Sequence, residues 1–399
     1  MRFSRRTEWN TEESELARAH RTRVAVGLPV ADLTASNPTR CGLTYDEGLL
    51  AALLDSRARE YDPQPKGLRP AREAVCRYYA DHGVSVNPEQ VVLTTSTSEA
   101  YSFLFRLLCD PGCEVLAPQP GYPLFDYLAA LDDVRVRATA LVYDHGWQVD
   151  PEGLRRALTP ETRAIMLVHP NNPTGHFTKP WEAEVLAVLC REHGLSLIVD
   201  EVFLDYSAGA SQGSFAAGLT DVPVYVVSGL SKIAGLPQMK AAWIVVTGPR
   251  QQEALARLDV IADTLLSMNA PVQWAMVAWL EGREKIQRQI RERVTANLAE
   301  LDLHLAGQFA TQRLVFEGGW YAVLRIPALQ PDEQTVLDLL NEGVWVHPGY
   351  FFGMEESGWL VVSLLAPCTE FRTGVTRLFA YLGTHQGGNG SGEMLQQKP

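Results

Sequence analysis

Long apolar stretches, basic runs and paired cysteines are all missing from this sequence of 399 residues. No segment approaches the ~20 apolar residues of a membrane-spanning helix. The positively charged start has no apolar stretch behind it, so we expect no secretory signal. The net charge of −12 without a basic run argues against nucleic acid or an anionic membrane as a partner. Six scattered cysteines without a CxxC pair favour a reducing, cytoplasmic location.

The composition is that of a globular protein with an ample core, 46% apolar and 21% charged. Apolar strand-like segments alternate with amphipathic helical segments, and this spacing predicts a mainly parallel α/β sheet covered on both faces by helices. The expected strands are residues 91–95, 114–117, 134–141, 164–168, 195–201, 225–227 and 241–246. The expected helices are residues 70–82, 100–109, 123–131, 151–157 and 180–193.

Different patterns flank this alternating region. Residues 8–24 predict a polar helix capped by Asn10 or Thr11, and such a helix ahead of a main domain is typical of a docking arm. Residues 281–305 predict a long charged connector helix, followed by the mixed strands and helices of an α+β domain. We therefore predict an N-terminal arm at 1–30, a large cofactor-binding domain at 31–280, a small domain at 281–382 and a disordered tail at 383–399.

Polar side chains that are unusual in a core follow the predicted strands where they end. They are Ser96, Thr97, Ser98, Asn172, Asp200, Ser231 and Lys232. Because ligands collect at the carboxyl ends of parallel strands, we expect these side chains at one edge of the sheet. Desolvation there would lower the pKa of Lys232 and leave a neutral amine able to attack a carbonyl. An amine, a carboxylate, an amide and hydroxyls suit pyridoxal 5′-phosphate, which has an aldehyde, a ring nitrogen, a phenolic oxygen and a phosphate.

These residues resemble the class I/II aminotransferases, a family of fold-type I pyridoxal-phosphate enzymes. The resemblance covers roughly residues 31–382. Its most specific signatures are Asn-Asn-Pro-Thr-Gly at residues 171–175, Asp-Glu-Val at 200–202 and the Ser231-Lys232 pair, in that order. It implies a mainly parallel, seven-stranded-type sheet with a smaller α+β domain, and a homodimer with shared active sites.

The resemblance also implies a role for each matching residue. Lys232 would form the Schiff base with pyridoxal phosphate and then move the proton. Asp200 would pair with the pyridinium nitrogen, Asn172 would bind the phenolic oxygen, and Tyr122 would stack on the ring. Ser96, Thr97, Ser98 and Ser231 would hold the phosphate, and Tyr61 would reach the phosphate in the neighbouring subunit.

Three positions depart from the pattern of the family. Lys240 stands where an arginine is usual near the cofactor, which keeps the charge but loses bidentate geometry. Phe203 replaces a tyrosine whose hydroxyl would reach the phenolic oxygen. Val361 stands where most relatives carry the arginine that binds the α-carboxylate of the substrate.

The substrate is left open by this last departure. Ser36 and Asn37 belong to a Ser-Asn-Pro turn, where Asn37 is a candidate for a neutral hydrogen bond to the carboxylate. A replacement cation is the other possibility, and the candidates are Arg40, Arg325 and Arg372.

The function predicted is transamination by ping-pong chemistry, from an amino acid or amine to a 2-oxo acid, in amino acid metabolism or biosynthesis. The same cofactor chemistry would serve a carbon–sulfur lyase or a decarboxylase, so these alternatives stay open. A non-catalytic sensor domain is a remote alternative, because only about thirty residues precede residue 31. His169 and His176 lack metal-ligand spacing, so we expect no metal site. Glu201 and Asp205 are expected to face a cleft wall or solvent.

Overall fold

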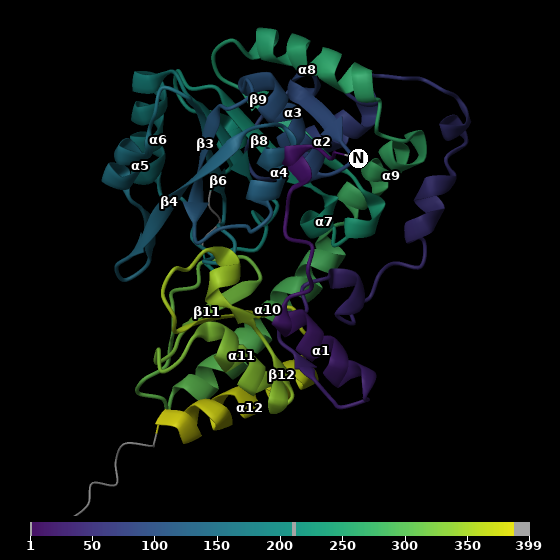
Figure 1. Ribbon diagram of the computed structural model, residues 1–399. Helices are drawn as coiled ribbons and strands as arrows, with labels where there is room; N and C mark the ends of the chain where they lie inside the picture. The colour runs from purple at the N-terminus through teal and green to yellow at the C-terminus, as the bar shows by residue number, and fades with distance from the viewer. Residues whose placement is uncertain (1, 210–212, 387–399) are drawn as a thin grey trace, which may run out of the picture. The chain divides into compact units, whose positions relative to one another are not determined.

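The computed structural model describes residues 2–209 and 213–386 (Figure 1). The chain forms two compact units, each assembled from separate segments. The large unit comprises the described residues up to Asn10, Asn37–Glu292 and Val315–Trp320. The small unit comprises Thr11–Ser36, Arg293–Leu314 and the described residues from Tyr321 onward. The contiguous domain boundaries expected from the sequence stay a prediction.

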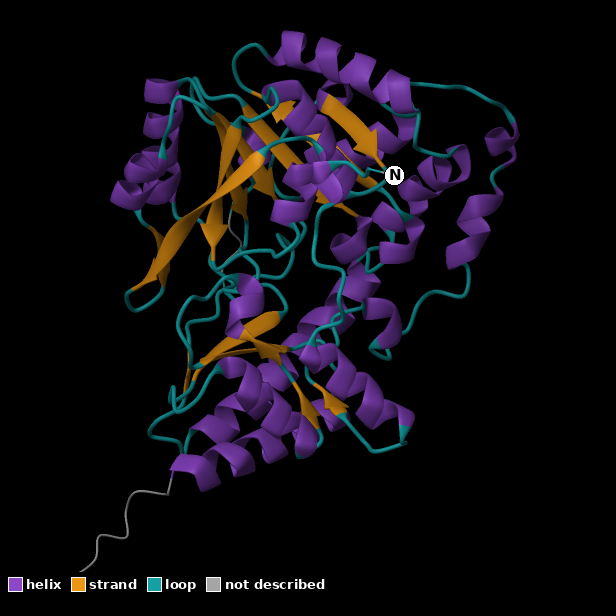
Figure 2. Ribbon diagram, viewed as in Figure 1, coloured by secondary structure: helices purple, strands orange, loops and turns teal. Residues whose placement is uncertain are grey.

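The large unit is built on one sheet in the order β2-β9-β8-β7-β6-β3-β4-β5 (Figure 2). The pairs β8–β7, β7–β6, β6–β3 and β3–β4 are parallel, which confirms the mainly parallel α/β fold. The described residues form eight strands rather than seven, because β5 pairs antiparallel with the long strand β4 at the edge. The strands are β2 (Val91–Thr94), β3 (Glu114–Gln119), β4 (Arg135–Tyr143), β5 (Trp147–Val149), β6 (Thr162–Val168), β7 (Ser196–Asp200), β8 (Val224–Gly229) and β9 (Ala242–Thr247).

Helices cover both faces of this sheet, as expected for strands that are apolar on both sides. On strand β9, Ile244 packs into a core cluster with α3 (Thr97–Leu108) and α8 (Gln251–Leu265). The neighbouring Trp243 points to the opposite face, where its indole donates to the Tyr79 hydroxyl of α2 (Arg69–Asp81) at 3.2 Å. Alternate residues of one strand therefore fill two separate cores.

The helices of the large unit mostly match the sequence pattern. The predicted bounds of α5 (Pro151–Ala157) and α6 (Pro180–His193) are confirmed, and in both helices a proline occupies the first turn. Helix α3 begins at Thr97, three residues before the predicted start, because the Ser96 side chain accepts from the Glu99 N–H at 3.1 Å and caps it. The other helices are α4 (Phe125–Leu131), α7 (Leu230–Ile233) and α9 (Ala270–Glu281).

Helix α10 (Glu284–Leu305) crosses the boundary between the two units, which falls after Glu292. Its predicted start at residue 281 is wrong by three residues, because α9 runs to Glu281 and Gly282 caps it. The predicted long helix is thus present in the connecting position.

The small unit contains an antiparallel sheet in the order β10-β11-β14-β13 and a parallel pair of β1 with β12. This agrees with the predicted α+β pattern. Its strands are β1 (Ala31–Asp32), β10 (Gln312–Arg313), β11 (Tyr321–Arg325), β12 (Val344–Trp345), β13 (His347–Pro348) and β14 (Trp359–Ser363). Its helices, apart from the end of α10, are α1 (Glu15–Ala25), α11 (Asp332–Asn341) and α12 (Cys368–Gln386).

Both ends of the described chain differ from the sequence prediction. The N-terminal helix is α1 and not residues 8–24, because the Ser14 side chain caps it by accepting from the Ala17 N–H at 3.2 Å. Its Leu16 is buried and α1 packs against α11 of the same chain. The disordered tail predicted for residues 383–399 is wrong for its first four residues, because α12 runs to Gln386. The rest of that tail lies outside the described residues.

Candidate active site

Six strands of the large unit point their carboxyl ends to one edge of the sheet: β4, which is parallel to β3, and the five strands that precede candidate site residues. Strands β3, β6, β7 and β8 are mutually parallel, and β2 runs with them because it is antiparallel to β9, which is antiparallel to β8. The ends of these five strands are Thr94, Gln119, Val168, Asp200 and Gly229. The topology therefore brings the residues that follow these strands to one edge.

Lys232 lies on the single-turn helix α7, directly after β8. Its Nζ is 5.1 Å from the centre of the Trp320 ring and 5.7 Å from the centre of the Phe203 ring. Desolvation by these surroundings lowers the pKa of Lys232, and the negative charge of Asp200 acts in the opposite direction. The lysine is thus biased towards the neutral amine, as the sequence predicted.

Asp200 ends β7 and is buried. Its carboxylate accepts from the Val202 N–H at 3.0 Å and from the Tyr101 hydroxyl at 3.1 Å. Burial raises the pKa of Asp200 to about 6, against the lowering effect of these hydrogen bonds and of Lys232. Because Asp200 and Lys232 interact electrostatically, the two groups lie in the same site. Tyr101, on α3, is a functional neighbour that the sequence reasoning missed.

The hydroxyl candidates gather around the start of α3. Ser96, Thr97 and Ser98 are half-buried there, and Ser231 is half-buried on α7. The first turn of a helix leaves N–H groups without intrahelical acceptors and carries a partial positive charge. Lys240 is different, since it is exposed and takes a left-handed backbone conformation (φ 50°) after a short 3₁₀ turn.

The asparagines of the predicted loop differ in their partners. The Asn171 amide donates to the Pro120 carbonyl at 3.0 Å and to the Thr174 hydroxyl at 2.9 Å, which fixes the loop after β6. The buried Oδ1 of Asn172 has no hydrogen-bond partner within residues 2–209 and 213–386. Tyr122, half-buried after β3, meets the Phe125 ring edge-on at 5.5 Å.

Trp320 is the second residue that the sequence reasoning missed. It is fully buried, it contacts Phe203 and Tyr206 edge-on at 5.3 and 5.2 Å, and its Nε1–H has no partner among the described residues. The sequence feature that could have pointed to Trp320 is Gly318, two residues before it. A Cβ there would lie 2.7 Å from the Tyr206 carbonyl, so only glycine permits this close approach.

The expected exposure of Glu201 and Asp205 was wrong. Glu201 is fully buried and accepts from the Ser214 hydroxyl at 2.7 Å and the Phe215 N–H at 2.6 Å, and burial raises its pKa to about 7. The side chain of Asp205 is 6% exposed and accepts from the Tyr78 hydroxyl at 3.1 Å. Both carboxylates are therefore buried, whereas the sequence predicted that they face a cleft wall or solvent.

The candidate substrate residues fall into both units. Asn37, in the large unit, is exposed and its Oδ1 accepts from the Thr39 N–H at 3.1 Å. Ser36 and Val361 belong to the small unit. Val361 is fully buried in β14, where it pairs with Val323 of β11.

Two of the three possible replacement cations are engaged within the small unit. The Arg325 guanidinium stacks on Trp359 at 4.3 Å and donates to the Ser357 carbonyl at 2.8 Å. Arg372 pairs with Glu300 at 3.1 Å. Arg40, in the large unit, is exposed and has no ion-pair partner within the described part of the chain.

The residues present fit pyridoxal phosphate when tested on their own chemistry. Asp200 is a carboxylate whose pKa burial raises to about 6, and a protonated ring nitrogen would give its charged form a cationic partner. A capped helix with hydroxyl side chains at its start suits a phosphate. Lys232 is a desolvated amine, and Asn172, in the loop after β6, has a buried amide oxygen without a partner among the described residues. Fold and site together define a pyridoxal-phosphate enzyme of the fold-type I class.

Comparison with known proteins gives the family. The family model "Aminotransferase class I and II" matches residues 33–373. The chain belongs to this family and is a pyridoxal-phosphate-dependent transaminase.

Similar proteins support this assignment. Glutamate-pyruvate aminotransferase AlaA of Haemophilus influenzae is 25% identical over 90% of this chain and 92% of its own length. Aspartate/prephenate aminotransferase of Thermus thermophilus is 28% identical over 82% and 84%. The solved structure of alanine aminotransferase from Pyrococcus furiosus has a TM-score of 0.87 at 24% identity, covering 96% of this chain and all of that one, and shows the same fold. Among the described residues, no helix is long and apolar enough to cross a membrane.

Proposed function

We propose that Lys232 binds the cofactor covalently and moves the proton during transamination. The observation that carries this proposal is its amine, desolvated beside the buried carboxylate of Asp200 at the ends of adjacent strands. Bound pyridoxal phosphate supplies an electron-withdrawing ring that stabilises negative charge at the α-carbon of the donor. The neutral amine of Lys232 accepts the proton from that carbon and later returns it.

The other residues bind the cofactor and orient it. Asp200 keeps a proton on the ring nitrogen through charge pairing, and the Tyr101 hydroxyl fixes its carboxylate at 3.1 Å. Asn172 hydrogen-bonds the phenolic oxygen and Tyr122 covers one face of the ring. The phosphate binds at the start of α3 through Ser96, Thr97 and Ser98, with Ser231 and the charge of Lys240 as further candidates. These roles are supported by the shared sheet edge and by the half-buried hydroxyls at a helix N-terminus.

The test of Lys232 is chemical. Borohydride reduction of the loaded protein should attach the cofactor irreversibly to the peptide that contains Lys232, as read by mass spectrometry. Lys232→Ala should abolish turnover and leave the cofactor extractable. Lys66→Ala, which removes a lysine of the same unit that pairs with Glu89 at 2.8 Å, is the matched control and should retain the attachment. Attachment to another lysine would contradict the assignment.

We propose that the donor is an amino acid or amine and that the acceptor is a 2-oxo acid. The relatives are named for glutamate–pyruvate and for aspartate or prephenate reactions. Val361 has only a buried hydrocarbon side chain, so it cannot donate to an α-carboxylate. An ordinary charge-assisted hydrogen bond contributes ~1.5–3 kcal/mol. Its loss would reduce the difference in binding free energy between amino acids and amines.

Arg40 is the candidate that would restore this bond, with Ser36 and Asn37 next to it in sequence. Its guanidinium has no ion-pair partner in the described chain, whereas Arg325 and Arg372 are engaged. Arg40→Ala should raise KM about tenfold or more for carboxylate-bearing donors and leave KM for simple amines unchanged. Arg59→Ala, which removes another exposed arginine of the large unit, is the control. An equal effect on both donor types would exclude Arg40 from carboxylate binding.

The reaction products distinguish elimination with the same cofactor from transamination. Release of pyruvate and ammonia without an acceptor would indicate a lyase, whereas transamination requires the 2-oxo acid. We expect conversion of the cofactor absorbance by single amino donors and its recovery by 2-oxo acids. This half-reaction also ranks the donors directly.

We further propose a cytoplasmic homodimer with shared active sites. Tyr61 is 84% exposed in a single chain and lines a hollow with Met268 and Asn269. An exposed aromatic ring beside polar groups suits contact with a second subunit. All six cysteines are free thiols, which suits a reducing compartment. Light scattering in solution should give twice the chain mass of 44.1 kDa.

A further inference from the structure

The backbone that carries Lys232 has carbonyls that its own helix cannot satisfy. Helix α7 is one turn long, so the carbonyls at its end and just beyond it have few backbone donors; the Lys232 oxygen accepts from the Gly235 N–H at 3.1 Å. Three side chains from distant parts of the large unit donate to carbonyls of α7 and of the turn that follows it. The bonds run from the Tyr206 hydroxyl to the Lys232 oxygen (2.6 Å), from Gln287 Nε2 to the Ile233 oxygen (2.9 Å) and from the Tyr45 hydroxyl to the Gly235 oxygen (2.6 Å). We name Tyr45, Tyr206 and Gln287 the carbonyl-capping group.

Each member of the carbonyl-capping group is itself held in place. Tyr206 is buried and packs edge-on against Trp320, the same ring that lies 5.1 Å from the Lys232 amine. Gln287 is buried near the start of α10. Burial raises the pKa of Tyr45 to about 12, so its hydroxyl remains a donor at neutral pH.

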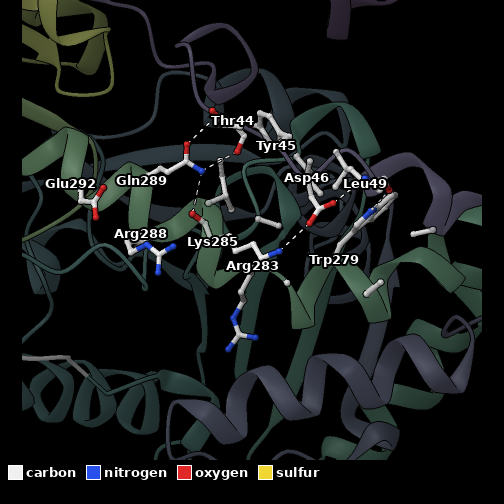
Figure 3. Close-up of a pocket in the computed structure, with 17 residues that line it drawn as sticks. Thr44, Tyr45, Asp46, Leu49, Trp279, Arg283, Lys285, Arg288, Gln289 and Glu292 are labelled. Carbon is white, nitrogen blue, oxygen red and sulfur yellow. Dashed lines mark hydrogen bonds and ion pairs between the residues drawn. The ribbon is translucent and has the colours of Figure 1, made fainter.

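The segment that carries Tyr45 is fixed to α10 by side chains (Figure 3). Gln289 accepts from the Thr44 N–H and donates to the Thr44 carbonyl, both at 2.9 Å. Lys285 pairs with Asp46 at 3.0 Å. Tyr45 therefore lies between two residues that are bonded to α10, and its hydroxyl donates to the Gly235 carbonyl from this position.

We propose that the carbonyl-capping group positions Lys232 for reaction with the cofactor and substrate. This inference rests on the proposed role of Lys232. The three residues act through the backbone, so they are positioning residues and not catalytic ones. Orientation matters because a displacement of about 1 Å at a reacting group can lower a rate a hundredfold.

The surroundings of this turn allow a positioning role of Tyr45 to be distinguished from a contribution to stability alone. A cavity of about 770 Å³ lies beside this turn, lined by Tyr45, Ala234 and Leu236 (Figure 3). If the Tyr45 hydroxyl is removed, water from the cavity can hydrogen-bond the Gly235 carbonyl in its place. Water restores most of the bond energy but does not fix the position of the turn. Removing the Tyr45 hydroxyl should therefore lower the free energy of unfolding only slightly and lower the reaction rate more.

Covalent capture of the cofactor tests this distinction. Tyr45→Phe and Gln287→Met each remove one donor with little change in size. After removal of the cofactor, the rate at which added pyridoxal phosphate becomes attached to Lys232 is followed by absorbance. We expect about three- to tenfold slower capture and a similar fall in kcat for each variant, with KM unchanged. The double variant should be slower than either single one.

The control is Tyr225→Phe. Tyr225 is a buried tyrosine on β8, its pKa is also raised to about 12 by burial, and its hydroxyl bonds the Ser196 side chain away from α7. This variant should capture the cofactor at the wild-type rate. Capture at the wild-type rate by Tyr45→Phe and Gln287→Met, with only a lower Tm, would overturn the proposal. Cofactor attachment to a residue other than Lys232 would instead overturn the proposed function. Should Gln287→Met fail to fold, Tyr45→Phe decides the question alone.

Discussion

Asp200→Asn should make the cofactor-free protein more stable and the enzyme much less active. The change keeps the size of the side chain and removes its charge. The amide oxygen can still accept from the Val202 N–H, and the Tyr101 hydroxyl can rotate to accept from the new amide group. The two expected effects have opposite signs because the same buried charge opposes folding and assists the reaction.

The gain in stability follows from the pKa of Asp200. Burial raises it from 3.8 to about 6, so the folded chain binds this proton more tightly than the unfolded chain does. Between about pH 4 and 6 the unfolded chain therefore binds fewer protons, and the free energy of unfolding falls as pH rises. A shift of about two units corresponds to about 3 kcal/mol, which is lost in full above that window. Asp200→Asn should recover up to this amount at pH 7.5 and nothing at pH 4.

The loss of activity follows from the proposed pairing with the ring nitrogen. Removing one partner of a buried charge pair costs about 3–5 kcal/mol, which corresponds to a fall in kcat/KM of about 10²–10⁴-fold. Lys232 should still bind the cofactor covalently, because its amine is untouched. The loss should therefore appear in kcat rather than in cofactor attachment.

Urea unfolding of the cofactor-free proteins between pH 4 and 8, combined with steady-state kinetics of the loaded proteins, measures both effects. An unfolding free energy equal to that of the wild type at pH 7.5 would show that Asp200 does not carry a buried charge. Unchanged kcat would show that no cation of the cofactor pairs with this carboxylate. Either result would refute the reasoning on which the site is built.

Three further predictions concern neighbouring positions. Glu201→Gln should abolish a separate fall in stability between about pH 4.5 and 7, because the folded chain holds the Glu201 proton up to about pH 7 and the unfolded chain releases it near 4.5; identical slopes in urea unfolding of the two proteins would contradict this. Phe203→Tyr should lower the midpoint of the absorbance titration of the bound cofactor, since a hydroxyl donor is added to a ring whose centre lies 5.7 Å from the Lys232 amine; an unmoved midpoint would place the new hydroxyl elsewhere. Tyr61→Phe should speed cofactor release from the proposed dimer without changing Tm, whereas Tyr127→Phe, at another exposed tyrosine, should change neither.

Local patterns in the sequence were sufficient where one segment controls its own structure. The bounds of α5 and α6 follow from a proline in the first turn and an amphipathic repeat, both of which act within a few residues. The strands β6, β7 and β8 follow from apolar runs, and these are buried on both faces. The position of Lys232 at the end of β8 was visible in the same way.

Prediction failed where a distant segment decides the environment. Glu201 was expected to face a cleft wall or solvent, but it is buried, and Ser214 and Phe215 donate hydrogen bonds to its carboxylate. Tyr101 reads as an ordinary core aromatic of α3, and only the packing of α3 against the sheet brings its hydroxyl to Asp200. The eighth strand, β5, is three residues long and gains its order from pairing with β4.

The sequence was enough to predict which polar residues follow the strand ends and in what order, because residue type and short-range periodicity are local properties. Tertiary structure alone decided their energetics. The lowered pKa of Lys232, the raised pKa of Asp200 and the three donors on the Lys232 turn all depend on groups tens to hundreds of residues away. Desolvation and hydrogen-bond geometry are set by what surrounds a group in space, and a linear pattern does not contain that information.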